Sequence, residues 1–97
     1  MEQLQFKELV VDQDNKLCFV NGEPLKLTKT EYVLLVLFLT NPNKIFSREE
    51  LIKEGWKDPV NTRAVDVAIT RLRKKLGDYG KHIVTRLGFG YGLNEVL

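Results

Sequence analysis

The block from Thr62 to Leu76 constrains the fold of this 97-residue chain more than any other part. Its apolar residues recur at spacings of four, three and four, so on an α-helix with 100° per residue they form one stripe. They are Val65, Ile69, Leu72 and Leu76. Thr62 is suited to cap the helix, Asp66 lies near its positive end, and Gly77 follows its last turn. A helix with one apolar stripe must pack that stripe against a core.

Two further helices are predicted by their start signals. Thr28-Lys29-Thr30-Glu31 and Ser47-Arg48-Glu49-Glu50 both have the form T/S-x-x-E, in which a hydroxyl and a glutamate satisfy the free N–H groups of a helix start. The first predicts a helix over about 29–40, apolar on all sides and therefore central and buried. The second predicts a short helix over about 48–54, closed by Gly55.

The two ends of the chain have β patterns. Short apolar groups in residues 4–27, separated by Asp14-Asn15 and by the hairpin signal Asn21-Gly22, predict a small antiparallel sheet. Residues 82–94 predict a hairpin whose tip is rich in glycine, with Gly88-Phe89-Gly90 at the turn. Helices segregated from antiparallel strands define the α+β class.

Length and composition limit the number of domains and the classes of protein to which the chain can belong. Its length and 43% hydrophobic content fit one domain, 1–97, with one small core: sheet 4–27, helices 28–76 and hairpin 82–94. Cys18 cannot form an internal disulfide, and with the one histidine it cannot complete a four-ligand zinc shell, so we expect no metal and a reducing compartment. The longest apolar run, Tyr32–Leu39, is too short to cross a membrane, which takes about twenty residues. We therefore expect this piece to be cytoplasmic.

The positive charge gathers in the C-terminal third of the chain. The net charge is only +2, but residues 61–97 hold seven basic and three acidic side chains, whereas residues 1–60 hold eight basic and ten acidic ones. On the helix over 62–76, the side opposite the apolar stripe is basic, with short neighbours. It carries Arg63, Val67, Thr70 and Lys74, with Arg71 at one edge and Arg73 at the flank.

This basic side has two interpretations. A helix fits the major groove of B-form DNA, where an arginine can bond guanine O6 and N7 while other cations neutralise phosphates. The alternative is a solvated basic face on an ordinary helix. The capped helix before it and the hairpin after it favour DNA binding, because they give the order of a helix-turn-helix followed by a wing. The connection of six residues, 56–61, is longer than that of the tight version.

At this point the residues match a known family. The sequence resembles the DNA-binding effector domain of OmpR/PhoB-type response regulators, a winged helix-turn-helix with a four-stranded antiparallel sheet before its three helices. The resemblance covers Leu27 to Leu93. Its motifs are Leu27-Thr28-x-x-Glu31, Phe46-Ser47-Arg48-x-x-Leu51, Trp56, the block from Arg63 to Leu76, and Ile83-x-Thr85-x-x-Gly88-x-Gly90-Tyr91.

The resemblance implies roles for single residues. It implies that Arg71 reads base edges, with Thr70 in the groove-facing row, and that Thr85 lies near the DNA backbone and Tyr91 in the wing. The same resemblance assigns Arg63, Arg73 and Lys74 to positions near the phosphates. It further implies binding to direct repeats, a contact of the loop 57–61 with RNA polymerase, and a receiver domain that is missing from this chain. We expect the isolated domain to be monomeric.

The wing departs from the family pattern. Leu87 stands where a minor-groove arginine is expected, and Gly92 replaces a second one. Arg86 is displaced by one position, and such a shift moves a side chain to the other face of a strand. We count Arg86 among the expected DNA contacts on the condition that the turn brings it back. Ala68 replaces a histidine that often contacts phosphate in the family.

Other motifs have simpler interpretations than catalysis. The glycines at 88, 90 and 92 fit no phosphate-binding loop, and His82 has no nucleophile placed beside it, so we expect a surface histidine, no enzyme and no cofactor. Cys18 is expected in the core or on a sheet face, and Trp56 is expected to close the core. Two alternatives to a response regulator stay open: a membrane-tethered regulator similar to ToxR, and a winged-helix module that binds protein.

Overall fold

An antiparallel sheet of four short strands forms the N-terminal part of the computed structural model, which describes residues 3–96. The strands β1 (Gln3–Phe6), β2 (Leu9–Asp12), β3 (Leu17–Val20) and β4 (Glu23–Pro24) lie in sequence order. Asn21 and Gly22 both have positive φ, 53° and 81°, as a tight hairpin turn requires. This turn was predicted from the sequence; β4 covers only two residues, and the Leu25 N–H after it still bonds the Cys18 carbonyl of β3 at 2.8 Å.

The first two helices begin at the predicted capping boxes. Helix α1 (Lys29–Thr40) follows Thr28, whose hydroxyl accepts from the Glu31 N–H while its own N–H donates to the Glu31 carboxylate. Helix α2 (Arg48–Gly55) follows Ser47, which makes the same reciprocal pair with Glu50. Gly55 is the last helical residue and not the residue that closes the helix, because the Trp56 N–H still bonds the Ile52 carbonyl.

Helix α3 (Thr62–Leu76) has the predicted length and a different cap. The side chain of Asn61, and not that of Thr62, accepts from the Arg63 N–H at 2.8 Å, so the cap lies one residue earlier than predicted. Gly77 ends the helix with a φ of 60°, as predicted. A 3-10 helix, η1 (Gly77–His82), follows where the sequence analysis assigned no element.

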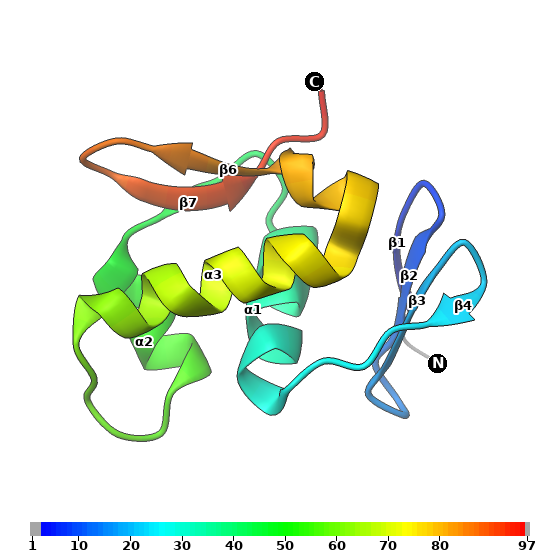
Figure 1. Cartoon of the computed structure of the whole chain (residues 1–97), viewed down its shortest axis with the longest axis horizontal. Helices are drawn as coiled ribbons and strands as arrows, with labels where there is room; N and C mark the ends of the chain where they lie inside the picture. The colour runs from blue at the N-terminus through cyan, green and yellow to red at the C-terminus, as the bar shows by residue number, and fades with distance from the viewer. Residues whose placement is uncertain (1–2, 97) are drawn as a thin grey trace.

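The wing belongs to a sheet of three strands. Its hairpin consists of β6 (Ile83–Arg86) and β7 (Gly90–Leu93), and β5 (Ile45–Phe46) pairs with β7 on the other side (Figure 1). β5 was not predicted, because two residues show no periodicity. β7 lies so close to β5 that a Cβ on Gly90 would stand 1.8 Å from the Phe46 carbonyl oxygen. Glycine is therefore required at this crossing.

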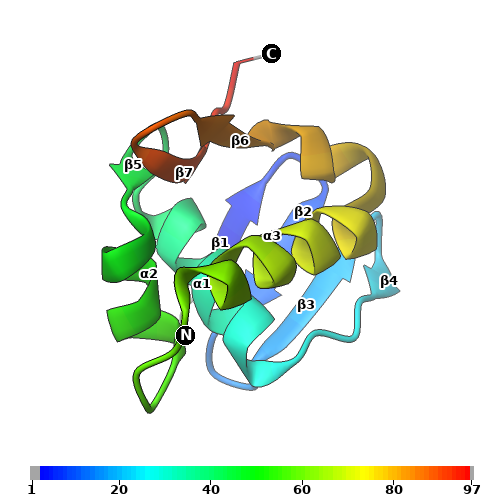
Figure 2. The same cartoon turned by 60° about the vertical axis from the view of Figure 1, so that its left-hand side comes forward.

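Helix α1 lies at the centre of the core, as its apolar pattern predicted. Leu34, Leu35 and Phe38 are fully buried, and the α3 stripe at 65, 69, 72 and 76 is buried against the same cluster. The N-terminal sheet covers one side of the helices, and the wing lies beside α3 (Figures 1 and 2). Cys18 is buried in the core and Trp56 packs at its edge, as predicted. Within residues 3–96, no helix is long and apolar enough to span a bilayer.

Candidate nucleic-acid interface

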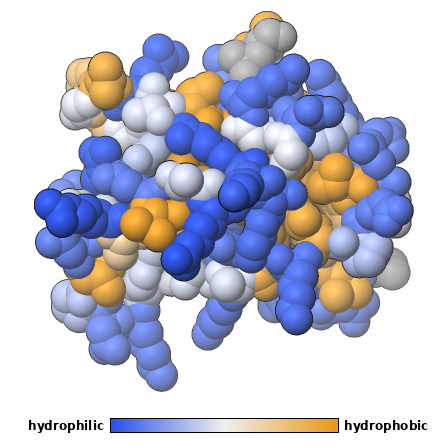
Figure 3. Space-filling model, in the orientation of Figure 1, coloured by the Kyte–Doolittle hydropathy of each residue, from blue (hydrophilic) through white to orange (hydrophobic). Residues whose placement is uncertain are grey.

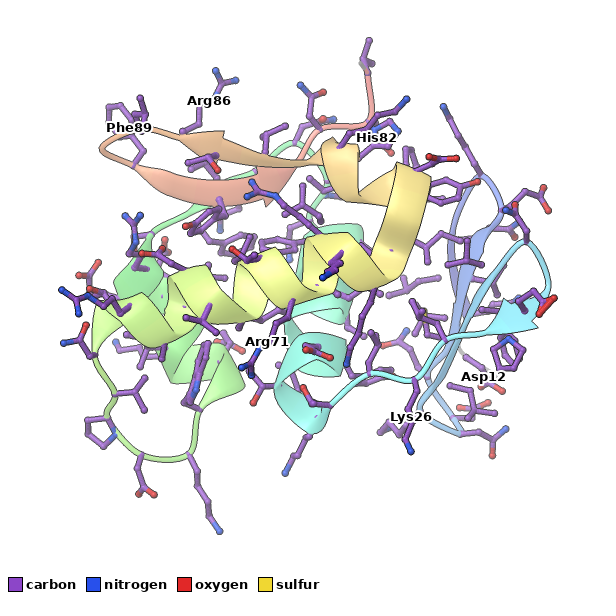
Figure 4. All side chains as sticks on the ribbon, viewed as in Figure 1. Asp12, Lys26, Arg71, His82, Arg86 and Phe89 are labelled. Carbon is purple, nitrogen blue, oxygen red and sulfur yellow. The ribbon has the colours of Figure 1, made fainter. Side chains whose placement is uncertain are left out.

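The basic side of α3 is open to solvent. The side chains of Arg63, Thr70, Arg71 and Lys74 are exposed, and Val67 keeps 47% of its surface accessible. Because the apolar stripe is buried, the opposite side of the helix faces outward along its whole length (Figure 4). The surface over α3 is mainly hydrophilic, with apolar area between the charged groups (Figure 3). The five positions of α3 that were predicted to be exposed, including Arg71 at the edge of the basic side, are therefore accessible to a partner.

The cations on this side are not neutralised by the protein itself. Among residues 3–96 there are two ion pairs, Arg48 with Asp66 and Lys75 with Glu31. Arg63, Arg71 and Lys74 take part in neither. Their charges therefore add to one positive field in front of α3, which attracts a polyanion.

Small residues leave space beside Arg71. A hollow of about 350 Å³ lies between α3, the start of α1 and Trp56. Ala64 and Ala68 form its α3 side, and Arg71 borders it together with Val67. A second, shallower hollow on the other flank is lined by Asp66, Val67, Thr70 and Arg71. The hollows on both flanks leave α3 raised above the neighbouring surface near Arg71, and this shape suits the entry of a helix into a groove.

Arg73 joins α3 to the wing. Its Nε donates to the Ile83 carbonyl at 2.8 Å, and its Nη2 donates to Thr85 Oγ1 at 2.7 Å. Arg73 and Thr85 were predicted as separate contacts near the DNA backbone, and the structure brings the two side chains together. The remaining N–H groups of Arg73 and the hydroxyl proton of Thr85 are still available, so their role toward phosphate stays a prediction.

Asp66 joins α3 to α2 and to the wing. One of its carboxylate oxygens accepts from Arg48 Nε at 2.8 Å and from the hydroxyl of Tyr91. The Tyr91 bond, followed by that of Arg48, holds the pKa of Asp66 below its usual value. Burial, together with the same hydrogen bond, raises the pKa of Tyr91. Asp66 lies past the first turn of α3. Its two partners, Arg48 and Tyr91, therefore account for an acidic residue at this position better than the helix dipole does.

Two guanidinium groups lie near the Tyr91 ring. Arg48 stands 5.4 Å from the ring centre and Arg73 stands 5.6 Å from it, both within cation–π range. Arg48 comes from α2 and Arg73 from α3, so the ring links the wing to both helices of the helix-turn-helix. No local sequence pattern pointed to this cluster, because its members are up to 43 residues apart in the chain.

The wing places Arg86 away from α3. Thr85 pairs with Tyr91 across the hairpin, and both side chains reach α3 residues, so the next residue, Arg86, lies on the opposite face. Figure 4 shows Arg86 pointing away from the helix. Its side chain borders a hollow with Ile45, Ser47, Glu50 and Phe89. The turn does not bring Arg86 back toward α3, and contact with DNA stays a prediction.

His82 is the residue whose environment was predicted wrongly. It is only 4% exposed, and its Nδ1 lies 2.9 Å from the Asn94 carbonyl, which accepts the bond. Its ring packs against Phe6 at 4.8 Å between centres. A residue 76 positions earlier thus buries this histidine, which explains why it did not look like a core residue. His82 closes the joint between the N-terminal sheet and the wing.

The fold and the site together define a winged helix-turn-helix domain, in which α2 and α3 form the two helices and β6 and β7 the wing. Residues 22–93 match the family model described as "Transcriptional regulatory protein, C terminal". The chain belongs to this family, the OmpR/PhoB-type effector domains.

Relatives and solved structures agree on this family. The chain is 42% identical over 96 residues to the response regulator ArlR of Staphylococcus saprophyticus, a match that covers 95% of this chain and 44% of ArlR. The DNA-binding domain of Klebsiella pneumoniae RstA, solved with the RstA box, is 30% identical with a TM-score of 0.86 and matches 98% of this chain and 99% of its own. The Thermotoga maritima response regulator DrrB is 33% identical with a TM-score of 0.86, over 95% of this chain and 44% of its own. The chain thus spans less than half the length of ArlR.

Proposed function

We propose that this chain binds duplex DNA in a sequence-specific manner, with α3 in the major groove, and acts as the effector domain of a transcriptional response regulator. One observation carries the proposal: Arg63, Arg71 and Lys74 are exposed on one side of α3 and belong to neither ion pair of residues 3–96. The likeness to the RstA domain, which was solved with its DNA box, supports the same conclusion.

Three residues of α3 carry the choice of sequence. Arg71 can donate two hydrogen bonds to guanine O6 and N7. The hydroxyl of Thr70 donates to the Asp66 carbonyl at 2.9 Å, which leaves its oxygen as an acceptor, suited to an amino group of adenine or cytosine. Val67, exposed on the same side, offers an apolar contact for the methyl group of thymine.

Other residues fix the position of the domain on the duplex. Arg63 and Lys74 are placed to neutralise phosphates on either side of the groove. Arg73 and Thr85 brace the backbone from the joint between helix and wing, using the hydrogen-bond donors that they do not share with each other. Arg86 is assigned to a phosphate outside this row, because its side chain lies on the far face of the wing.

The role of the longer protein follows from the relatives. As in response regulators, a receiver domain would control this domain, which would bind direct repeats in the cytoplasm. The residues of the loop 57–61 are all exposed, which suits the contact with RNA polymerase that the family resemblance implies. The receiver domain, the direct repeats and RNA polymerase are proposed from the family resemblance and not from the geometry of α3.

The test begins with a selection of binding sites from random duplexes. We expect one motif to be recovered, with a spacing that gives the half-site distance. Arg71→Ala should then lose about 1–3 kcal/mol of discrimination at one base pair of this motif. An unchanged ratio of motif to scrambled duplex in this variant would show that Arg71 does not read bases.

Salt dependence separates DNA binding from protein binding. Log K should fall linearly with log salt, and Lys74→Ala should reduce the slope by about 0.9 while weakening all sequences alike. Lys26→Ala is the matched control, because Lys26 is an exposed lysine near the N-terminal sheet, away from α3 (Figure 4). A flat salt dependence and no recovered motif would favour a module that binds protein.

A further inference from the structure

The carboxylate of Glu31 is buried between α1 and α3, and one of its oxygens is left without a partner. The residue is only 3% exposed. Its Oε1 accepts from the Thr28 N–H at 2.9 Å and from Lys75 Nζ at 2.6 Å. Within residues 3–96 its Oε2 accepts no hydrogen bond, and it is not completely buried, because no completely buried side-chain oxygen of these residues lacks a partner. Glu31 therefore keeps one acceptor that a further donor can reach.

This second oxygen of Glu31 opens into the hollow beside Arg71. Glu31 borders the hollow of about 350 Å³, and Arg71 is the one cation among the described residues that line it. Figure 4 shows Arg71 extending from α3 toward the start of α1. Arg71 and Lys75 are one turn apart on α3, so both side chains can reach the same carboxylate. The structure pairs Glu31 with Lys75, and Arg71 belongs to neither ion pair of residues 3–96.

A buried carboxylate holds its cation strongly. Removing one partner of a buried ion pair leaves an uncompensated charge, which is unfavourable. Without the charge of Lys75, Glu31 would regain a partner most directly from Arg71, which borders the same hollow. A guanidinium held in the hollow lies against α1 and not in front of α3. It cannot bond guanine in the major groove from that place.

We propose that Lys75 is a positioning residue for the reading of DNA: by occupying Glu31, it keeps Arg71 available to the bases. This inference rests on the proposed function, in which Arg71 is the residue that bonds guanine. Lys75 acts through Glu31 and needs no contact with DNA for this role. Its charge decides which of two places Arg71 takes, the hollow or the groove.

The first experiment compares the recovered motif with the same duplex changed at the base pair assigned to Arg71. Lys75→Met keeps a long side chain and removes its charge, so the ratio of the two affinities should fall at least about fivefold. Glu31→Gln removes the carboxylate that would capture Arg71, and its ratio should stay within about twofold of the wild type. The double variant Glu31→Gln/Lys75→Met should regain the ratio that Lys75→Met loses.

Lys74→Met is the matched control. Lys74 is the neighbouring lysine of α3, is exposed, and belongs to neither ion pair of residues 3–96. Its replacement should weaken the two duplexes alike and leave their ratio unchanged. Lys75→Met and Glu31→Gln both break the same ion pair, so a role in stability alone would affect them in the same direction. The opposite expectations for their ratios therefore separate positioning from stability.

The second experiment follows Arg71 without DNA. Nuclear magnetic resonance measures how fast the Nε–H proton of Arg71 exchanges with water in the free domain, with Arg71→Lys to assign the signal. In Lys75→Met this exchange should be several-fold slower than in the wild type, because the carboxylate of Glu31 holds the guanidinium. In Glu31→Gln/Lys75→Met it should return to the wild-type rate.

The outcomes separate this inference from the proposed function. If Lys75→Met keeps the wild-type ratio while Arg71→Ala still loses it, Arg71 reads bases and the role of Lys75 is wrong. Equal losses in Lys75→Met, Glu31→Gln and the double variant would also overturn the inference, because the ion pair would then act through stability alone. Unchanged exchange of the Arg71 proton in Lys75→Met would show that Glu31 does not capture Arg71. If the wild type recovers no motif, the proposed function fails and the role of Lys75 fails with it.

Discussion

Gly90 is the position in the wing where a side chain has the least room. Gly90→Ala would place a Cβ 1.8 Å from the Phe46 carbonyl oxygen, and its φ of 143° adds backbone strain. We expect a loss of at least about 3 kcal/mol in the free energy of unfolding, measured by urea unfolding followed by circular dichroism. Gly88→Ala is the control: its φ is also positive, but its Cβ meets nothing within 4 Å, so the loss should be about 1–2 kcal/mol. Equal losses would contradict the crossing of β5 and β7 described above.

Single residues also show what a sequence can and cannot predict. Arg71 and Val67 were assigned to the exposed side of α3 by helical period alone, and the structure places them there. Arg73 was assigned to the same basic group, but its two bonds to the wing depend on residues 10 and 12 positions away in another element. His82 was misread for the same reason, and the partners of Asp66 were not predicted. Local pattern predicts which way a side chain points and does not identify its distant partners.

At the scale of elements, the caps define where the helices begin. Thr28→Ala removes the hydroxyl that accepts from the Glu31 N–H, and we expect it to lower the free energy of unfolding by about 0.5–2 kcal/mol. Thr40→Ala is a matched control at the other end of α1, because the Thr40 hydroxyl only bonds the Val36 carbonyl within the helix. Urea unfolding of both variants checks the prediction. A smaller effect for Thr28 than for Thr40 would show that the cap contributes little.

The joint between α3 and the wing depends on the shape of a guanidinium. Arg73→Lys keeps the charge but cannot reproduce two bonds to Ile83 and Thr85 from one planar group. We expect weaker DNA binding with an unchanged salt slope, together with faster hydrogen exchange of the β6 amides. If the β6 amides of the Arg73→Lys variant exchange at the wild-type rate, Arg73 does not hold the wing and contributes to phosphate binding alone.

Elements differ in how far the sequence predicts them. α1 and α2 have capping boxes and α3 has an apolar period, so their ranges were predicted to within one residue. The hairpin β6–β7 followed from its glycine-rich turn. β5 was not predicted, because its two residues pair with Gly92 and Tyr91, more than 40 residues further along the chain. A strand of two residues, such as β5, forms only when its partner strand β7 supplies the hydrogen bonds.

At the scale of the whole molecule, carboxylates with a lowered pKa make stability depend on pH, and Glu31 and Asp66 are the two of them that form ion pairs. Burial raises the pKa of Glu31, but the bonds from Lys75 and Thr28 outweigh it and leave the pKa below its usual value of 4.5. The Tyr91 and Arg48 bonds hold the pKa of Asp66 below 3.8. The unfolded chain therefore binds protons more readily than the folded one in this range, so stability rises with pH there.

We accordingly expect the contribution of these carboxylates to the free energy of unfolding to be complete near neutral pH and to fall as the pH drops below about 4.5. Glu31→Gln should be less stable than the wild type at pH 7, because Lys75 loses its partner, but its further loss in acid should be smaller. Urea unfolding across this pH range measures both. A parallel fall in the two proteins would show that Glu31 does not carry the acid sensitivity.

The bonds of Arg73 and Tyr91 hold the helix and the hairpin together. They set the distance between the outer surfaces of the two elements, which a bound duplex must match. Two operators with identical bases at each contact, but with one base pair inserted between them, would differ in helical phase by roughly a tenth of a turn. This domain would therefore bind the two operators with different affinities, although the bases at each contact are the same.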